Sequence, residues 1–337
     1  YGPMPVCGGT AAKYYPNGQS MFADMLPALQ GAQHSIYVES FIIGMGEMWG
    51  QIHEILRRKA AAGLDVRVIY DDAGCLSLLP HNYAEMMRAD GIRAFSFNRC
   101  VPVLNLVMNN RDHRKIMVID GQIAFTGGVN LADEYINKIV RFGYWKDSGV
   151  RLDGPGAASL ANIFLTFWKA KSPDEDLDAG CDLPAAVPVE TDCLVQPFAD
   201  TPVDREAVAK NVYLELINQA QKRLYICTPY LILDNDLLSC LLATFTRLGG
   251  VPEECITDNM SCLVTVSGRR RTRQERAWRF AREAGFELRL CAPRSPQTKG
   301  KDESANRFLN RLLAYGGEFT GWSGLAEAVA RVEAQAN

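Results

Sequence analysis

Apolar residues recur with two different periods over residues 1–170. Stretches with an apolar residue every three or four positions indicate amphipathic helices, and alternating or β-branched stretches indicate strands. Helices are predicted at 21–32, 49–62, 83–89 and 160–169, and strands at 34–41, 66–70, 92–97, 115–119, 123–126 and 149–152. Residues 2–18, rich in Gly and Pro, are expected to form an N-terminal loop or an early hairpin. Because strands alternate with helices, the pattern favours an α/β fold with parallel strand pairs.

The order of helix then strand starts again after residue 206. A helix is predicted at 207–221 and a strand at 224–230, in the same order as helix 21–32 and strand 34–41. We interpret this order as an internal repeat, that is, as the start of a second lobe. The stretch 172–188 before it is acidic and contains Pro, which is typical of an inter-lobe linker.

Composition places the chain among ordinary globular proteins. It is 47% hydrophobic and 22% charged with a net charge of −3, so no global charge draws it toward nucleic acid or anionic lipid. The ten cysteines include no Cys-x-x-Cys pair, which argues against a zinc site or disulfide framework and favours a reduced, cytosolic setting. The longest apolar runs are too short to span a bilayer, and no signal peptide is recognisable. The chain opens on Tyr1, which fits a fragment of a longer protein.

The segment 109–130, NNRDHRKIMVIDGQIAFTGGVN, carries the candidate chemistry. His113 and Lys115 lie two residues apart where an apolar, β-branched run begins, so their side chains share one face of the predicted strand. An ammonium beside an imidazole suits a phosphate diester. Lysine holds the anionic oxygens, and histidine attacks phosphorus or transfers a proton near neutral pH. The alternative for a single histidine is a buried structural residue.

The residues that follow the strand complete this candidate site. Asp120 and Gly121 form a turn signal between two predicted strands. Gly127 and Gly128 let the backbone approach a ligand closely, because neither carries a side chain. Asn130 can donate a hydrogen bond to a phosphate oxygen.

These motifs resemble a known family. The pattern His-x-Lys-x-x-x-x-Asp, formed by His113, Lys115 and Asp120, resembles the motif of the phospholipase D superfamily. The longer stretches NNRDHRKIMVIDG, FTGGVNLADEYIN and FGYWKDSG are similar to bacterial cardiolipin synthases, over about residues 14–242. The resemblance implies a first lobe built on a mixed sheet flanked by helices, with no metal or other cofactor.

The resemblance also implies a reaction on phosphatidylglycerol or a related phospholipid, at the cytoplasmic side of the bacterial membrane. One histidine attacks phosphorus and forms a phosphohistidine while another protonates the leaving glycerol, and a second phosphatidylglycerol then gives cardiolipin. His113 would be the nucleophile or the acid. Lys115, Asn130 and Gly128 would bind the phosphate, and Asp120 would brace the motif.

Two further carboxylates are candidates for supporting roles. Asp147 matches the acidic residue that orients a catalytic histidine in the family, and the alternative is a surface Asp beside Lys146. Glu39 stands near the end of a predicted strand, where it either lines the pocket or is a solvated charge.

A complete site of this family needs a second His-x-Lys motif. The chain has four histidines, at 34, 53, 81 and 113, so none follows the first motif. The second lobe is therefore expected to be truncated and the activity impaired. Activity would require two chains to pair their first lobes across a two-fold axis, so we expect a homodimer.

After about residue 243 the sequence changes character. The stretches LGGVPEECITDNM, CAPRSPQTKGKDESANRF and LAEAVARVEAQAN resemble the integrase-core transposases of bacterial insertion sequences. This resemblance implies a partial RNase H-like α/β tail in which Asp258 and Glu303 are two of three Mg²⁺ ligands, although no third carboxylate precedes Asp258 in a matching context. Seven arginines between Arg269 and Arg282 predict either contact with DNA or a solvated helix face.

Together these inferences divide the chain into a first phospholipase D-like lobe at 1–170, a linker with a truncated second lobe at 171–244, and a transposase fragment at 245–337. The predicted function is that of a cardiolipin synthase-like phosphatidyltransferase. The alternatives are a DNA-binding transposase remnant, which would need Mg²⁺, and an inactive hybrid produced by gene fusion.

Overall fold

The computed structural model describes most of the chain up to residue 200 and shorter stretches beyond it. The described residues are 4–100, 111–141, 143–172, 183–200, 207–219, 235–247, 249–251, 253–257, 264–267, 270–273 and 275–290. The chain divides into two compact units, unit 1 (Tyr1–Asp204) and unit 2 (Arg205–Asn337).

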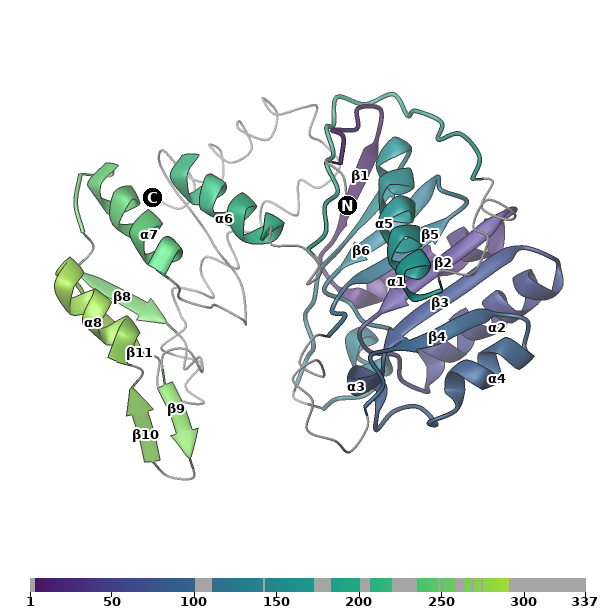
Figure 1. Cartoon of the computed structure of the whole chain (residues 1–337), viewed down its shortest axis with the longest axis horizontal. Helices are drawn as coiled ribbons and strands as arrows, with labels where there is room; N and C mark the ends of the chain where they lie inside the picture. The colour runs from purple at the N-terminus through teal and green to yellow at the C-terminus, as the bar shows by residue number, and fades with distance from the viewer. Residues whose placement is uncertain are drawn as a thin grey trace. The chain divides into compact units, whose positions relative to one another are not determined.

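The described part of unit 1 is built on one mixed sheet of seven strands, in the order β1-β7-β6-β5-β2-β3-β4 (Figure 1). Strands β2, β3 and β4 are parallel, whereas β5, β6, β7 and β1 continue the sheet in antiparallel pairs. This confirms the predicted mixed α/β sheet. The bounds are β1 Ala11–Tyr15, β2 Ser35–Ser40, β3 Asp65–Asp71, β4 Arg93–Phe97, β5 Lys115–Ile119, β6 Ile123–Gly127 and β7 Gly149–Asp153.

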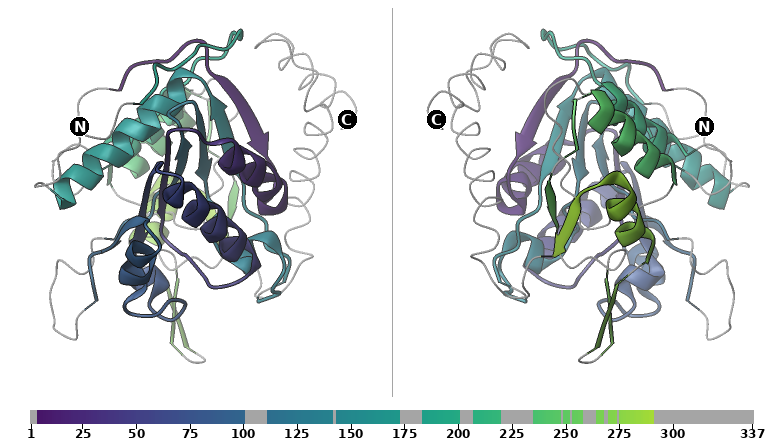
Figure 2. Two further views of the ribbon diagram at one scale, coloured as in Figure 1. Left: turned by 90° about the vertical axis from the view of Figure 1, so that its right-hand side faces the viewer. Right: turned by 90° about the vertical axis from the view of Figure 1, so that its left-hand side faces the viewer.

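Helices cover both faces of this sheet (Figure 2). The helices α1 (Gly18–Gly31), α2 (Glu47–Ala61) and α4 (Tyr83–Ala89) pack on one face, and α5 (Pro155–Lys171) packs on the other. Every residue of β2 and β5 is consequently buried. This is the reason that four of the five residues of β5 are apolar.

Two strands at the centre of the sheet position the candidate site. Strand β2 runs antiparallel to β5, and the register places Ser40 opposite Lys115. The end of β2 and the beginning of β5 therefore meet at one end of these two central strands, here named the open edge of the sheet. The short helices α3 (Asp72–Cys75) and η2 (Asp133–Ile136) follow other strands of the sheet.

Local signals explain where two of these helices begin. Helix α1 follows Asn17, whose side-chain oxygen accepts a hydrogen bond from the Ser20 amide at 2.9 Å. Helix α5 begins at Pro155 rather than at residue 160, because proline is favoured at the first position of a helix, where no amide hydrogen is needed. The pattern-based prediction started this helix too late since it relied on apolar spacing.

The N-terminal segment, predicted to be a loop or an early hairpin, forms a strand whose partner lies far away in the sequence. Residues 11–15 pair with β7 as the edge strand β1, with Tyr15 buried and the three preceding side chains exposed. Residues 183–200, which include the end of the predicted linker, also pack on unit 1. Cys7 and Val195 exchange two backbone hydrogen bonds of 2.7 and 3.0 Å. The compact unit 1 accordingly extends to residue 204.

Unit 2 contains helices and short strand pairs in its described part. Strand β8 (Glu254–Thr257) is parallel to β11 (Glu287–Leu290), and β9 (Val264–Ser267) is antiparallel to β10 (Arg270–Arg273). The predicted strand 224–230 lies outside the described residues. The truncated second lobe and the RNase H-like tail remain predictions. The helices are α6 Val208–Gln219, α7 Asn235–Arg247 and α8 Glu275–Ala284.

Candidate functional site

The side chains of His113 and Lys115 meet at the sheet edge where β5 begins. Lys115 is the first residue of β5, and its Nζ donates to the His113 carbonyl oxygen at 2.6 Å and lies 3.2 Å from His113 Nδ1. Phe41, just beyond β2, contacts both groups. Its ring centroid lies 4.6 Å from that of the imidazole and 5.4 Å from Lys115 Nζ. The structure thus brings the predicted imidazole and ammonium together against one aromatic ring.

The two groups differ in their access to solvent. Lys115 is only 9% exposed, and this burial lowers its pKa to about 8, against the opposing charges of Asp112 and Asp147. The His113 ring can be reached from solvent, yet desolvation by the surrounding protein, and secondly the charge of Lys115, lower its pKa below the ordinary value. An accessible imidazole that is mainly neutral at pH 7 therefore stands beside a lysine that loses its proton slightly above neutral pH.

Asp147 and Gly128 pack directly against each other. A Cβ added to Gly128 would collide with the Asp147 carboxylate, and the Gly128 amide donates to the Ser148 carbonyl at 2.9 Å. The negative charge of Asp147 acts in the opposite direction to burial, so it partly offsets the lowering of the pKa of both His113 and Lys115. The glycine is thus needed for the approach of a carboxylate, whereas the sequence suggested the approach of a phosphate ligand.

Asn130 is buried and hydrogen-bonded to protein groups. Its Nδ2 donates to Tyr135 Oη at 2.6 Å, and its Oδ1 accepts from the Ile42 amide at 3.0 Å. Only 3% of the residue is exposed. Asn130 therefore ties the segment after β6 to the segment after β2, and only a remaining amide hydrogen is left for the predicted contact with phosphate.

Asp120 lies at the opposite end of β5 from Lys115. Its carboxylate accepts hydrogen bonds from the amides of Gln33, His34 and Ser35 at 2.9, 2.7 and 2.8 Å, where β2 begins. Five residues of strand separate the two side chains by about 16 Å, so Asp120 does not touch the imidazole–ammonium pair. Its hydrogen bonds suit the predicted bracing role and do not suit direct participation in catalysis.

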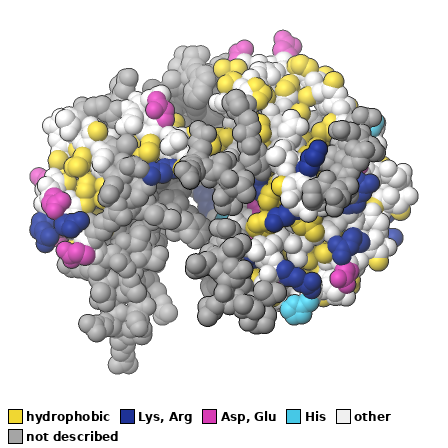
Figure 3. Space-filling model, in the orientation of Figure 1, with side chains coloured by type: hydrophobic (Ala, Val, Ile, Leu, Met, Phe, Trp, Pro, Cys, Tyr) yellow, Lys and Arg dark blue, Asp and Glu magenta, His cyan; other side chains and the backbone are white. Residues whose placement is uncertain are grey.

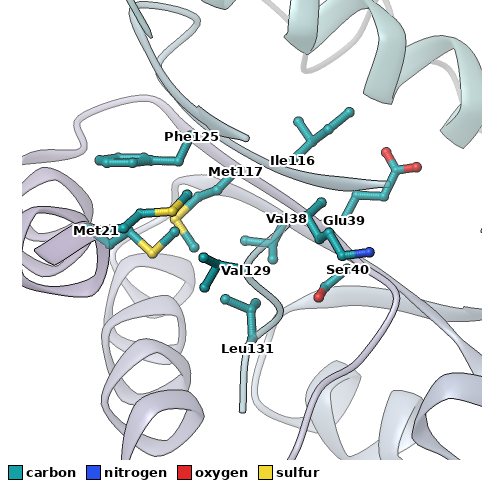
Figure 4. A pocket seen from close by; sticks show the side chains of 11 residues that line it. Met21, Val38, Glu39, Ser40, Ile116, Met117, Phe125, Val129 and Leu131 are labelled. Atoms are coloured by element: carbon teal, nitrogen blue, oxygen red, sulfur yellow. The ribbon is translucent and has the colours of Figure 1, made fainter. Parts of the chain in front are cut away.

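Glu39 points to the other side of the sheet, into a buried charged cluster. Arg114 Nε lies 2.8 Å from Glu39 Oε1 and donates to Asp112 Oδ1 at 3.0 Å, and its guanidinium covers the Phe167 ring at 4.2 Å. Burial, and then the neighbouring Asp112, raise the pKa of Glu39 well above the ordinary value. Figure 4 shows the Glu39 carboxylate and Ile116 on one side of the strands, and Ser40 on the other. Glu39 is neither solvated nor in contact with His113.

Asp112, Arg114 and Phe41 were not identified from the sequence. Asp112 and Arg114 alternate with His113 and Lys115, so the period of two along a strand was the signal that could have placed them on the opposite face. The contact with Phe41 had no such signal, because it joins positions 72 residues apart in the chain.

The space beside Lys115 belongs to the core. A cavity of about 10 Å³ lies between α1 and strands β2, β5 and β6, and its lining includes Met21, Val38 and Phe125 (Figure 4). Such a volume holds at most one water molecule, so this cavity does not admit a substrate.

No group of three or more His, Cys, Asp or Glu residues within the described ranges is arranged to hold a metal ion. Asp258 and Glu303 lie outside those ranges, so the Mg²⁺ site remains a prediction. In the same part of the chain, no helix is both long and apolar enough to cross a bilayer.

Comparisons with known proteins connect this geometry to a family. Residues 25–142 match the family model of the cardiolipin synthase, PLD-like domain. An uncharacterized protein of Streptococcus mutans is 38% identical over 315 residues, which are 94% of this chain and 60% of that protein. The cardiolipin synthase of Alkalihalophilus pseudofirmus is 34% identical over 259 residues, which are 77% of this chain and 51% of that enzyme. The chain thus spans between half and two thirds of the length of these relatives.

A solved structure shares the fold. The phosphatidylserine synthase of Haemophilus influenzae superposes with a TM-score of 0.56 at 17% identity, over 86% of this chain and 76% of that one. These findings support the resemblance to cardiolipin synthases. They give no support to a fusion with a transposase, because the alignment with the Streptococcus mutans protein is long enough to extend into residues 245–337.

Proposed function

We propose that unit 1 is the catalytic lobe of a cardiolipin synthase-type phosphatidyltransferase. The observation that carries this proposal is the pairing of an accessible imidazole with a buried ammonium at the open edge of the sheet, where Lys115 Nζ lies 3.2 Å from His113 Nδ1. The ammonium neutralises a phosphodiester oxygen at the position where the imidazole reaches phosphorus. The similarity to cardiolipin synthases favours phosphatidylglycerol as the substrate.

The proposed first step is an exchange at phosphorus. A ring nitrogen of His113 forms a bond to the phosphatidyl phosphorus, and the bond from phosphorus to the glycerol oxygen breaks. The leaving oxygen takes a proton from a second imidazole, and the phosphatidyl group remains on His113. The hydroxyl of a second phosphatidylglycerol then displaces His113, returns a proton to the second imidazole and gives cardiolipin. Asp147 supports the cationic imidazole through its charge.

The second imidazole in this proposal comes from a second copy of the chain. No histidine follows His113 up to residue 337, so residues 1–337 carry one His-x-Lys motif. A two-fold pairing of unit 1 would place two copies of His113 across one phosphate. Light scattering at micromolar concentration should then report a dimer, and a strictly monomeric but active protein would contradict the pairing.

The test of the function is phosphatidylglycerol turnover in mixed micelles. The wild-type chain should release glycerol and form cardiolipin or phosphatidic acid, and His113→Ala should abolish turnover. The matched control is His34→Ala, since His34 is exposed at the opposite edge of the sheet and only its backbone contacts Asp120. Turnover that survives His113→Ala, or that is absent from the wild type, would contradict the proposal.

The alternative of a DNA-binding transposase remnant rests on the arginines of unit 2. On helix α8, Arg279 lies 3.8 Å from Glu283 and Arg282 lies 3.8 Å from Glu275, so the described part of this face carries both signs of charge. On unit 1, the face visible in Figure 3 shows basic side chains mixed with hydrophobic ones.

Salt-sensitive DNA binding that disappears when the chain is truncated at Ala243 would favour the transposase alternative over the phosphatidyltransferase.

A further inference from the structure

The segments 138–141 and 143–146, here together named the docking loop, expose large apolar side chains beside the candidate site. Ile139, Val140 and Tyr144 are 53%, 73% and 68% exposed. Lys138, Arg141 and Lys146 in the same loop are exposed as well, and its eight described residues include no acidic side chain. Apolar tips interspersed with cations form a surface that is unfavourable in water and favourable against an anionic lipid layer.

The base of the docking loop is fixed. Asn137, in the left-handed conformation at φ +56°, closes it with two hydrogen bonds to Trp145. Its Nδ2 donates to the Trp145 carbonyl at 2.8 Å, and its Oδ1 accepts from the Trp145 amide at 2.6 Å. The Trp145 ring packs on Tyr135 with centroids 5.0 Å apart. The apolar residues therefore stand on a closed base, and this limits the entropy lost on binding.

This base is built on the candidate site itself. Tyr135, which supports Trp145, accepts the hydrogen bond from Asn130. Two residues after Trp145 comes Asp147, whose charge acts on His113 and Lys115. A lipid surface that binds the docking loop would therefore lie beside the open edge of the sheet, from which a phosphodiester reaches His113.

We propose that the docking loop inserts Ile139, Val140 and Tyr144 into an anionic phospholipid surface and presents lipid phosphates to His113. This inference deepens the proposed function by naming the form in which the substrate arrives. Tyrosine is favoured at the boundary between head groups and acyl chains, where its ring is buried and its hydroxyl stays hydrated.

The cations of the docking loop fit this partner. Lys138 lies 3.0 Å from Glu47 and Arg141 lies 4.0 Å from Glu134. Both basic side chains are more than half exposed, and exposed ion pairs of this kind are weak, so these cations can exchange their partners for lipid phosphates. A second copy of the chain is a poorer occupant, since three side chains fall short of the ~800 Å² that each partner gives to a stable protein interface.

Vesicle sedimentation tests the proposal with the full chain. The probes are vesicles of phosphatidylcholine with phosphatidylglycerol and vesicles of phosphatidylcholine alone. The substitution Ile139→Ser/Val140→Ser/Tyr144→Ser should reduce binding to the anionic vesicles about tenfold or more. It leaves the Asn137–Trp145 hydrogen bonds in place, so the thermal unfolding midpoint should stay near that of the wild type. Wild-type binding should be weaker to the neutral vesicles than to the anionic ones, and its binding to the anionic vesicles should decrease with salt.

A matched control separates this effect from a general loss of surface hydrophobicity. The control Val6→Ser/Tyr14→Ser/Met86→Ser removes three other exposed apolar side chains of unit 1, which are 57%, 51% and 46% exposed. It should bind vesicles as the wild type does. Equal loss of binding in both variants, unchanged binding in the docking-loop variant, or no binding of the wild type would overturn the proposal. A docking-loop variant that loses only dimerisation would do the same, since the loop would then hold a second copy.

Activity measurements distinguish this proposal from the proposed function. His113→Ala should bind vesicles normally, so binding without turnover would contradict the phosphatidyltransferase and leave the docking loop supported. The docking-loop variant should keep its turnover of monomeric short-chain phosphatidylglycerol and lose that of vesicle-bound lipid. Equal loss on both substrates would contradict docking.

Discussion

Replacing Lys115 by Met should stabilise unit 1 at neutral pH although it removes the candidate phosphate ligand. Burial lowers the lysine pKa from the ordinary value of 10.5 to about 8, which corresponds to about 3 kcal/mol for holding the charged form inside the protein. The substitution also removes the hydrogen bond to the His113 carbonyl, at a cost of about 1 kcal/mol. The net expectation is a gain of about 2 kcal/mol at pH 7.

The pH dependence gives this prediction its sign. Below about pH 8 the lysine is charged in the folded and the unfolded chain, so the full burial cost lowers wild-type stability. Between about pH 8 and 10.5 the folded chain releases the proton first, and wild-type stability rises relative to Lys115→Met. The advantage of the variant should therefore shrink with rising pH and change to a disadvantage of about 1 kcal/mol above pH 10.5.

Urea unfolding at several pH values measures these differences. Pulsed hydrogen exchange on the peptide that contains β5 reports unit 1 separately from unit 2. The matched control is Lys59→Met, which removes an ammonium that also donates to a backbone carbonyl, that of Ala32, at 2.6 Å. This control should lose about 1 kcal/mol. A Lys115→Met protein that is less stable than the wild type at pH 7, or a difference independent of pH, would refute the reasoning.

Three further predictions follow from the site. Turnover of phosphatidylglycerol should rise with pH as His113 loses its proton, at a pH below the ordinary pKa of histidine, and should fall above pH 8 as Lys115 loses its proton. Lys115→Arg should keep its rate at high pH, and an unchanged fall in that variant would contradict the assignment of the fall to Lys115. Gly128→Ala should displace the Asp147 carboxylate, lowering turnover about tenfold and costing about 2 kcal/mol in chemical denaturation; a fully active variant would show that the carboxylate does not act on His113. Asp120→Ala should cost about 2 kcal/mol, measured by calorimetry, because three amides lose their acceptor, while kcat of the folded protein stays near the wild-type value.

Local sequence determined the elements and the pair at the centre of the site. Helix α4 and strand β5 have the predicted bounds, because apolar spacing and β-branched runs depend on neighbouring residues alone. The spacing of two residues at the beginning of β5 was enough to place His113 and Lys115 side by side. The edge strand β1 was not predicted, since three of its five side chains are exposed and its pairing with β7 lies far away in the sequence.

Tertiary structure alone decided the partners of the other candidate residues. Asp120 binds amides about 85 residues away, and Asn130 joins Ile42 to Tyr135. Glu39 meets Arg114 only because β2 and β5 are neighbours in the sheet. Such contacts form when distant strands align, and no local period records which strands those are. The sequence therefore determined which side chains can perform the chemistry, and the arrangement of the strands decided which of them stand at the open edge.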